Sequence, residues 1–350
     1  VYKRQVVEPS PDRIVPRCEY FGTCGGCALQ HLSPEAQLAL KQKSLLEQLQ
    51  RIGGVSPDRE LEPLAGQPFG YRRRARLGAR FVEKKGRVLV GFREKYKPYV
   101  ADMHSCMTLA PRLSDLIGQL SDLVGRLSLI RDVPQIELSL GDSALAIVLR
   151  VMQSPSEEDT GLLREFERRV DAAIWLQTGG PGSLAQLTPQ RSALLDYALP
   201  DYDQRLGFGP LDLIQVNQDT NRRMIAQALA LAQPQPGQRI LDLFSGIGNF
   251  SLPLARSAGA VVGVELDPHM VERARINAAS NGIGNAEFFA ADLGRPDSEP
   301  GWWRPGFDTV VLDPPRSGAL ESLPRIAAAG AKRIVYVSCH PGSLARDAGI

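Results

Sequence analysis

The sequence contains five cysteines, and four of them have the spacing of a metal-binding site. Cys18, Cys24 and Cys27 lie in CEYFGTCGGC, a C-x5-C-x2-C run, and Cys106 in HSCMTLAP supplies the fourth ligand that a tetrahedral site needs. Thiolates bind both zinc and iron–sulfur clusters, so the spacing alone leaves both open. An odd number of cysteines without a signal peptide argues against a disulfide framework.

The fifth cysteine, Cys339, ends an apolar run in VYVSCHPGSLARD. An isolated cysteine is usually a small core residue, but this one stands where a strand is expected to end. An exposed thiol there can act as a nucleophile if a nearby positive charge favours the thiolate. His340, Arg346 and Arg316 are candidates for that charge, and Arg316 is alternatively a contact for a phosphate or a base.

The elements that must position Cys339 are apolar runs alternating with helical segments in the second half of the chain. The expected strands are RILDLF, AVVGVELD, AEFFAAD, FDTVVLDPPR and RIVYVSC. Continuous apolar strands separated by helices predict an α/β fold with a parallel, doubly wound sheet. Ligands of such sheets bind at the carboxyl ends of the strands, which here carry Asp242, Glu265, Asp292, Asp313 and Cys339.

The first turn of this region, DLFSGIGNF, favours S-adenosylmethionine over a dinucleotide. Glu265 follows Gly246 by 19 residues, an offset at which an acid can bind two ribose hydroxyls. However, no third glycine follows Gly248, and Asp242 would repel a pyrophosphate while attracting a cationic sulfonium-bearing amino acid.

The first half of the chain predicts a helix after Ser33-Pro34 that stops at Gly53-Gly54, and then a basic hairpin. Eleven Lys or Arg and two Glu lie between residues 72 and 97. We expect this face, with Arg72, Arg73, Arg74 and Arg76, to contact RNA phosphates, although a solvated hairpin face is the alternative. The composition changes near LPDYDQRLGFGP, which we take as a boundary region.

Composition sets only broad limits on function. The chain has 350 residues, of which 43% are hydrophobic, and this length is enough for two domains. The net charge is only +2, so the overall charge does not indicate a nucleic-acid partner. No apolar run approaches the roughly 20 residues that span a bilayer, and the start is not a signal peptide. We expect a cytoplasmic monomer and a fragment cut at both ends, since the chain opens on Val1 and stops just after a motif.

LDLFSGIGNF, VVGVELD, LDPPRSG and VYVSCHPGSLARD together resemble the RNA uracil-5 methyltransferases. CEYFGTCGGC and GFREKYKPYVADMHSCMTLAP extend the resemblance to the iron–sulfur branch that acts on 23S ribosomal RNA, from roughly Val6 onward. The resemblance implies three parts: the tail of a TRAM RNA-binding barrel over residues 1–16, an α+β iron–sulfur and RNA-binding domain over 17–205, and a Rossmann-like methyltransferase domain over 206–350.

The resemblance also implies roles for individual residues. Cys18, Cys24, Cys27 and Cys106 would hold a [4Fe-4S] cluster, and Cys339 would be the nucleophile. The implied contacts of S-adenosylmethionine are Gln215, Phe244, Asn249, Glu265, Asp292 and Asp313. The family's carboxylate base is expected downstream of Ile350.

The chemistry of such an enzyme explains the lone thiol. Uracil C5 is a poor nucleophile, but addition of a thiolate to C6 gives an enolate whose C5 can attack a methyl sulfonium. A base then removes the C5 proton, and the enzyme is eliminated. The target uracil must leave its stack, and Asp313 is expected to orient it or the reactive end of the cofactor.

Three departures and three alternatives accompany this interpretation. His340 replaces the family's Asn, Ser245 replaces a Cys, and Leu213-Ile214 stand where an aromatic residue is common. A uracil-5 methyltransferase of transfer RNA or of another ribosomal site is one alternative, and a non-catalytic RNA-binding metalloprotein is the second. The third alternative, an amino-group methyltransferase, is disfavoured. Such enzymes often carry an aromatic residue after the two prolines of this motif, and here that position is Arg316, in DPPR.

Overall fold

The computed structural model describes residues 6–191, 194–295 and 301–350 and forms two compact units. Unit 1 comprises residues 1–41 and 67–195, and unit 2 comprises residues 42–66 and 196–350. Within the described residues no helix is long and apolar enough to cross a membrane.

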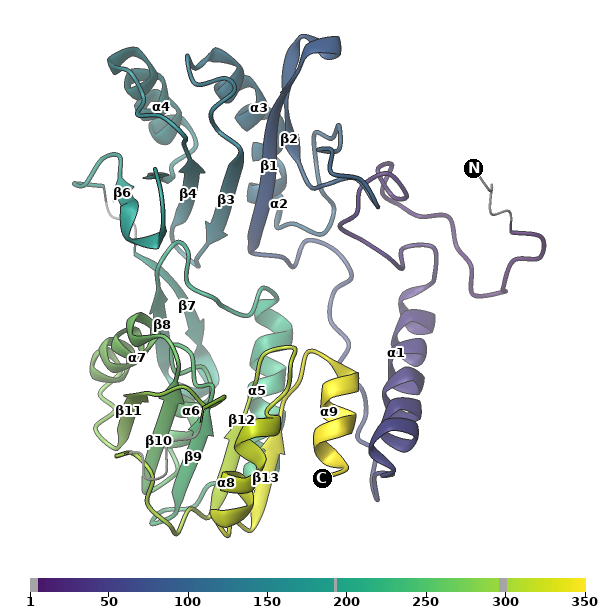
Figure 1. The fold of residues 1–350 in the computed structure, drawn as a ribbon, viewed down its shortest axis with the longest axis vertical. Coiled ribbons are helices and arrows are strands. Elements are labelled where there is room, and N and C mark those ends of the chain that lie inside the picture. Colours follow the sequence, from purple (N-terminus) through teal and green to yellow (C-terminus); the bar gives the residue numbers. More distant parts are fainter. Residues whose placement is uncertain (1–5, 192–193, 296–300) are drawn as a thin grey trace. The chain divides into compact units, whose positions relative to one another are not determined.

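Unit 1 is built on a six-stranded sheet in the order β2-β1-β3-β4-β5-β6, antiparallel except for the pair β4–β5 (Figure 1). The strands are β1 (Arg74–Val82), β2 (Arg87–Gly91), β3 (Gln135–Leu140), β4 (Leu145–Arg150), β5 (Ala173–Gln177) and β6 (Leu184–Gln186). Helices α2 (Pro111–Ser114), α3 (Leu116–Arg126) and α4 (Glu157–Arg169) share one apolar core with the sheet. The predicted basic hairpin is confirmed as β1–β2, whose turn places Gly86 at φ 60°, the left-handed region that favours glycine.

The chain before α1 forms isolated bridges rather than strands. Among residues 6–33, Arg13 bridges to Leu32 and Phe21 to Cys24. The TRAM remnant expected over residues 1–16 falls partly outside the described residues, since the first five are not described, and it stays a prediction.

Unit 2 contains the predicted parallel, doubly wound sheet, which is confirmed. Its order is β11-β10-β9-β12-β13, and all neighbouring pairs are parallel. The strands are β9 (Arg239–Leu243), β10 (Ala260–Glu265), β11 (Ala286–Ala290), β12 (Thr309–Leu312) and β13 (Arg333–Tyr336), with β7 (Leu195–Leu199) and β8 (Gln204–Phe208) in a separate pair. The helices are α5 (Gln218–Ala232), α6 (Ser251–Ala255), α7 (Pro268–Ser280), α8 (Leu323–Ala328) and α9 (Pro341–Ala348). Strand order reverses at β9, so the crevice beside its carboxyl end is the expected ligand site.

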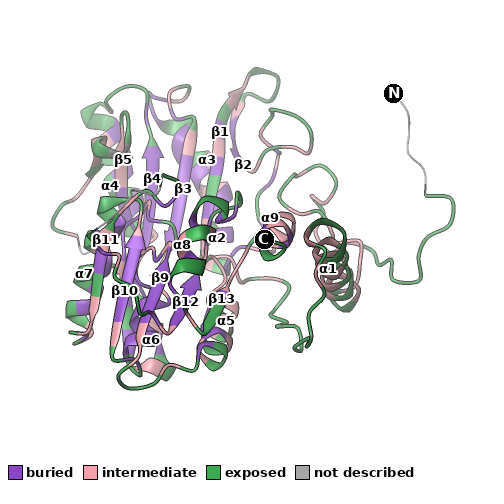
Figure 2. Cartoon of the chain, turned by 60° about the horizontal axis from the view of Figure 1, so that its bottom comes forward, coloured by how far each residue is buried: buried purple, intermediate pink, exposed green. Residues whose placement is uncertain are grey.

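Helix α1 (Pro34–Gln48) continues into a π-helical turn, Leu49–Gly53, as the sequence predicts apart from that turn. The Ala36 N–H donates to Ser33 Oγ (3.2 Å), and α1 buries no residue (Figure 2). The turn packs on α9: a Cβ on Gly53 would lie 2.2 Å from the Ala345 carbonyl oxygen. The two backbones therefore approach closer than any side chain allows.

Candidate active site

Asp242 lies inside β9 and has no solvent exposure. Ser251 Oγ donates a hydrogen bond to its Oδ2, while Oδ1 has no partner among the described residues. The pKa of this carboxyl is raised to about 7, mainly by burial and also by the nearby charges of Asp313 and Glu265, although the Ser251 hydrogen bond acts in the opposite direction. The three acids thus belong to one electrostatic group, as expected for carboxyl ends of adjacent parallel strands.

Glu265 at the end of β10 holds the first loop of the sheet in place. Its carboxylate accepts from the N–H groups of Gly246 (3.0 Å) and Leu266 (2.8 Å). Every second residue of the loop has a positive φ: 62° at Phe244, 56° at Gly246 and 94° at Gly248. Such a loop brings backbone rather than side chains to the switch point.

Asp313 follows β12 and is joined to the segment before α5. Gln215 Nε2 donates to Asp313 Oδ2 at 3.1 Å. Burial raises the pKa of Asp313 to about 6, although the Gln215 hydrogen bond acts in the opposite direction. These two expected cofactor contacts, 98 residues apart in sequence, are therefore brought together.

The remaining two expected cofactor contacts, Asn249 and Asp292, already form hydrogen bonds within the protein. Asn249 forms a reciprocal amide pair with Asn221 (2.9 Å in each direction) and accepts from the Tyr197 hydroxyl at 2.8 Å. Asp292 accepts from the Gly294 N–H at 2.9 Å. Tyr197 and Asn221 were missed at the sequence level, where nothing in their spacing marked them.

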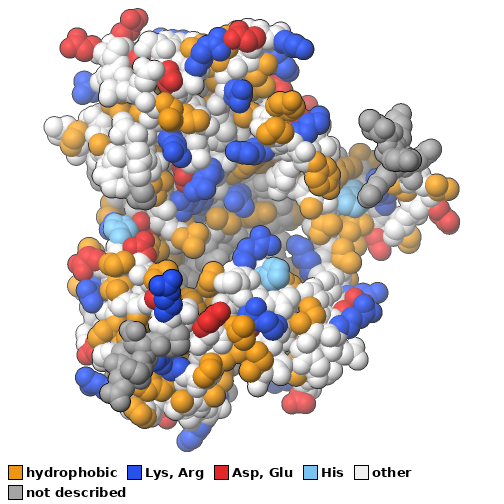
Figure 3. Space-filling view, viewed as in Figure 1, with side chains coloured by type: hydrophobic (Ala, Val, Ile, Leu, Met, Phe, Trp, Pro, Cys, Tyr) orange, Lys and Arg blue, Asp and Glu red, His pale blue; other side chains and the backbone are white. Residues whose placement is uncertain are grey.

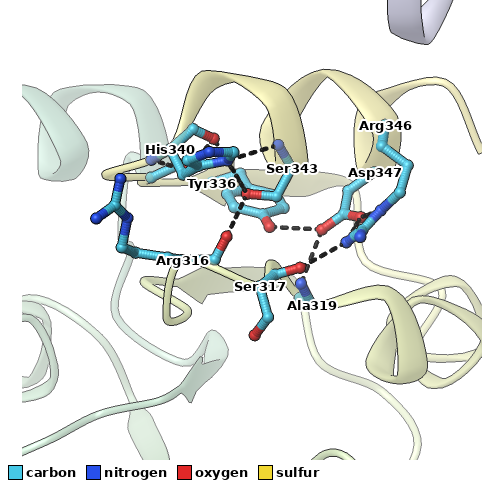
Figure 4. A network of polar contacts seen from close by, with 9 residues as sticks. Arg316, Ser317, Ala319, Tyr336, His340, Ser343, Arg346 and Asp347 are labelled. Atoms are coloured by element: carbon cyan, nitrogen blue, oxygen red, sulfur yellow. Dashed lines mark hydrogen bonds and ion pairs between the residues drawn. The ribbon is translucent and has the colours of Figure 1, made fainter.

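Cys339 is free and exposed in the short connection between β13 and α9. The next residue, His340, caps α9, because its Nδ1 accepts from the Ser343 N–H at 3.1 Å (Figure 4). His340 is therefore the N-cap of α9.

Arg346, a candidate for the positive charge that would favour the Cys339 thiolate, forms an ion pair with Asp347. Its Nη2 lies 2.6 Å from Asp347 Oδ1, and the same carboxylate accepts from the Tyr336 hydroxyl (2.6 Å) and the Ala319 N–H (2.7 Å). Burial opposes ionisation of Asp347, yet these donors prevail and lower its pKa. Figure 4 shows the Arg316 side chain directed away from this pair, and Arg316 makes no ion pair within the described residues.

The loop before α8 closes onto α9 at Gly318, which has φ +85°. A Cβ there would lie 2.5 Å from Asp347 Oδ2 and 2.6 Å from Arg346 Nη2. The Ser343 Oγ donates to the Arg316 carbonyl at 2.9 Å in the same loop. The residues around the thiol are therefore held by the DPPRSG loop.

The four other cysteines line one cavity of about 210 Å³ in unit 1. Burial raises the pKa of the Cys18 and Cys24 thiols, and the neighbouring Cys106 and Cys27 act in the same direction. Across the described ranges no three metal-binding side chains converge closely enough for a single ion.

Three of the four arginines expected at the RNA surface are paired with acids. Arg74 and Arg76 each lie 3.2 Å from Glu137, and Arg73 contacts Asp142. Acidic side chains also lie among basic ones at the top of Figure 3, near the β1–β2 turn. The charge of the hairpin is thus partly neutralised, and its contact with RNA stays a prediction.

Comparison with known proteins gives matches both to the second half of the chain and to nearly its whole length. A family model described as a methyltransferase domain matches residues 234–335. A solved tRNA (uracil-54, C5)-methyltransferase from Pyrococcus abyssi, in complex with S-adenosyl-L-homocysteine, has a TM-score of 0.71 and 24% identity, covering 98% of this chain and 80% of that one. Sheet order, switch-point site and these matches define a Rossmann-like methyltransferase.

Two curated relatives narrow the class to a family. The 23S rRNA (uracil(1939)-C(5))-methyltransferase RlmD of Alkalilimnicola ehrlichii is 51% identical over 99% of this chain and 78% of its own length. RlmD of Xylella fastidiosa is 52% identical over 98% of this chain and 77% of its own length. The chain belongs to the RlmD family of 23S rRNA uracil-5 methyltransferases.

Proposed function

We propose that this protein transfers a methyl group from S-adenosylmethionine to C5 of a uridine in 23S ribosomal RNA. The observation that carries the proposal is the exposed Cys339 at the carboxyl end of β13, in a methyltransferase sheet of this family. The same proposal makes the protein a cytoplasmic monomer in contact with ribosomal RNA.

The proposed role of Cys339 is covalent. Its thiolate adds to uracil C6, which places an electron pair on C5 for bond formation to the methyl group. Loss of the C5 proton then re-forms the C5–C6 double bond and releases the thiolate. The loop that holds α9 through Ser343 and Gly318 fixes the position of the thiol during both steps.

The residues of the switch point fit S-adenosylmethionine, which supplies the methyl group. The unpartnered Oδ1 of Asp242 and the carboxylates of Glu265 and Asp313 form an acidic set suited to a cationic ligand. Glu265 would bind the ribose, and Gln215 would orient Asp313 through their 3.1 Å hydrogen bond. Phe244, Asn249 and Asp292 are proposed contacts on the same side of the sheet.

A [4Fe-4S] cluster is the proposed occupant of the four-cysteine cavity. Four thiols around about 210 Å³ form a donor set suited to such a cluster. Its role is structural, because it belongs to the core of unit 1: buried Cys106 and half-buried Cys24 both pack in that core.

A covalent-adduct experiment tests the proposal. The protein is incubated with S-adenosylmethionine and 5-fluorouridine-substituted 23S rRNA fragments, and its intact mass is measured after ribonuclease. Fluorine cannot leave as a proton, so we expect a methylated adduct on Cys339, absent without cofactor and absent in Cys339→Ala.

The controls separate the alternatives. Transfer RNA with the same substitution should give no adduct, and an adduct with it alone would assign the protein to that substrate instead. Failure of the protein to form any adduct, with RNA affinity unchanged in Cys339→Ala, would contradict the proposal and favour a binding protein.

A further inference from the structure

Unit 1 contains a second cavity, next to the four-cysteine cavity and larger. It has a volume of about 580 Å³, within the range of small-molecule sites, and we call it the Tyr96 pocket. Its walls are the Gly25–Gly26 loop, residues 76–78 of β1, the segment 92–96 and residues 134–135. Gly26 and Phe92 line both cavities, so the cysteine loop forms one wall of the Tyr96 pocket.

The charge of the Tyr96 pocket suits a phosphate. Three basic residues and one acid line the pocket: Arg76, Arg93, Lys95 and Glu94. The Glu94 carboxylate is paired at 3.2 Å with Lys97, which is not part of the lining. Arg76 is fixed by Glu137 (3.2 Å) while its side chain remains 68% exposed. Arg93 makes no ion pair within the described parts of the chain, so its guanidinium is available to an anion.

The aromatic side of the pocket suits a base. Tyr96 is 94% exposed and has φ 64°, a backbone conformation that few residues with a side chain adopt. It occupies the third position of a turn closed by the Lys97 N–H to the Glu94 carbonyl (3.3 Å), where glycine or asparagine is usual. Strained, exposed side chains of this kind occur at ligand clamps. Lys95 Nζ lies 5.3 Å from the ring centroid, which positions a cation beside the stacking surface.

The turn that carries Tyr96 is held by the cysteine loop. The Lys95 N–H donates to the Thr23 carbonyl (2.7 Å), and the Gly25 N–H donates to the Arg93 carbonyl (2.8 Å). A Cβ on Gly25 would lie 3.1 Å from that same carbonyl oxygen, so only glycine allows this approach without a shift. The pocket is therefore preorganised by backbone contacts.

We propose that the Tyr96 pocket binds one unpaired nucleotide of the RNA substrate, with its base stacked on Tyr96 and its phosphate on Arg93 and Arg76. The proposal rests on the proposed function, since it takes the polyanion to be RNA. It adds a nucleotide-binding subsite in unit 1, away from the thiol in sequence and built from other residues. A stacked base with a phosphate on arginine is the usual recognition of single-stranded RNA.

The test compares pocket variants with matched surface variants. Tyr96→Ala and Arg93→Ala remove the stacking ring and the phosphate contact. Tyr99→Ala and Arg164→Ala remove an exposed aromatic and an exposed cation that lie outside the pocket lining and outside the basic hairpin. RNA affinity is measured with a 23S rRNA fragment at several salt concentrations, together with kcat and KM.

We expect Tyr96→Ala to weaken RNA binding by roughly 10- to 100-fold and to raise KM with kcat unchanged. Tyr96→Phe should restore binding. Arg93→Ala should reduce the salt slope of log Kd by about 1. Tyr96→Gly should bind as poorly as Tyr96→Ala while unfolding at the same or a higher temperature, because glycine relieves the positive φ.

Equal affinities of Tyr96→Ala and wild type would overturn the pocket proposal, and so would an equal loss in Tyr99→Ala. The adduct on Cys339 reports separately on the proposed function. If wild type forms the adduct but Tyr96→Ala binds normally, only the pocket fails. If no adduct forms but Tyr96→Ala still weakens RNA binding, only the proposed function fails.

Discussion

Asp242 is a carboxyl group buried inside a parallel sheet with one oxygen unpartnered among the described residues. Its pKa of about 7 in the folded protein exceeds the roughly 3.9 of an unfolded chain. Below about pH 4 both states are protonated, so the group has no effect on stability. As pH rises from about 4 to about 7 the unfolded state ionises first, and the free energy of unfolding falls.

We therefore expect Asp242→Asn to flatten the pH dependence of stability. The wild type should lose on the order of 2 kcal/mol between pH 5 and pH 8 relative to Asp242→Asn, measured by urea unfolding without cofactor. The exposed Asp201→Asn serves as a control that should follow wild type. Parallel curves for wild type and Asp242→Asn would show that Asp242 ionises normally in the fold.

For single residues, the sequence predicts where a site residue lies in the fold better than it predicts which side chains that residue contacts. Glu265, Asp313 and Cys339 were found because carboxyl ends of parallel strands share one edge, and apolar runs mark where strands end. The pairing of Asn249 with Asn221 and Tyr197 was not, because these partners lie 28 and 52 residues away on other elements. The ion pair of Arg346 with Asp347 was likewise not predictable, because both side chains also bond to the loop before α8, which only folding brings to α9.

The contact between the π-helical turn and α9 is the feature of element scale that most constrains the sequence. Gly53 and Gly54 are adjacent, but a Cβ on Gly53 would meet backbone at 2.2 Å, whereas one on Gly54 would meet nothing within 4 Å. At Gly54 the only constraint is the backbone conformation, because its φ of +64° lies in the left-handed region that favours glycine.

We expect Gly54→Ala to destabilise unit 2 by about 1 kcal/mol, the cost of a left-handed residue with a side chain. Gly53→Ala should cost several times more and should free α9, because backbone cannot move aside as a flexible side chain can. Thermal unfolding and protease cleavage near Cys339 report the two effects. Equal losses in both variants would mean that the turn does not dock on α9.

The elements themselves were largely predictable, and their docking was not. Alternation of apolar and polar residues predicted the β1–β2 hairpin, and five apolar runs predicted the parallel sheet. Nothing in the sequence indicates that residues 42–66 join unit 2, because the close approach of Gly53 to the Ala345 backbone leaves no hydrophobic pattern.

For the molecule as a whole, removal of the proposed cluster should affect one unit. Cys18, Cys24, Cys27 and Cys106 all lie in unit 1, and their cavity is part of its core. We expect purified protein to contain iron and sulfide, and Cys106→Ser to lose both. Hydrogen exchange should then rise in residues 67–195 and stay unchanged in the sheet of unit 2. Zinc in place of iron, or uniform exchange over both units, would contradict this expectation.

The route of the chain through the two units also sets an order of synthesis. Residues 42–66 emerge from the ribosome long before α9, the helix on which their turn docks. A contact between segments so distant in sequence closes late, since loop-closure entropy must be overcome first. Residues 67–195, the larger part of unit 1, lie between these two segments in the chain and can fold before α9 is made. Helix α9, which follows the proposed nucleophile Cys339, thus becomes ordered only after nearly all of this sequence has been translated. The thiol therefore reaches its final position after unit 1 has folded.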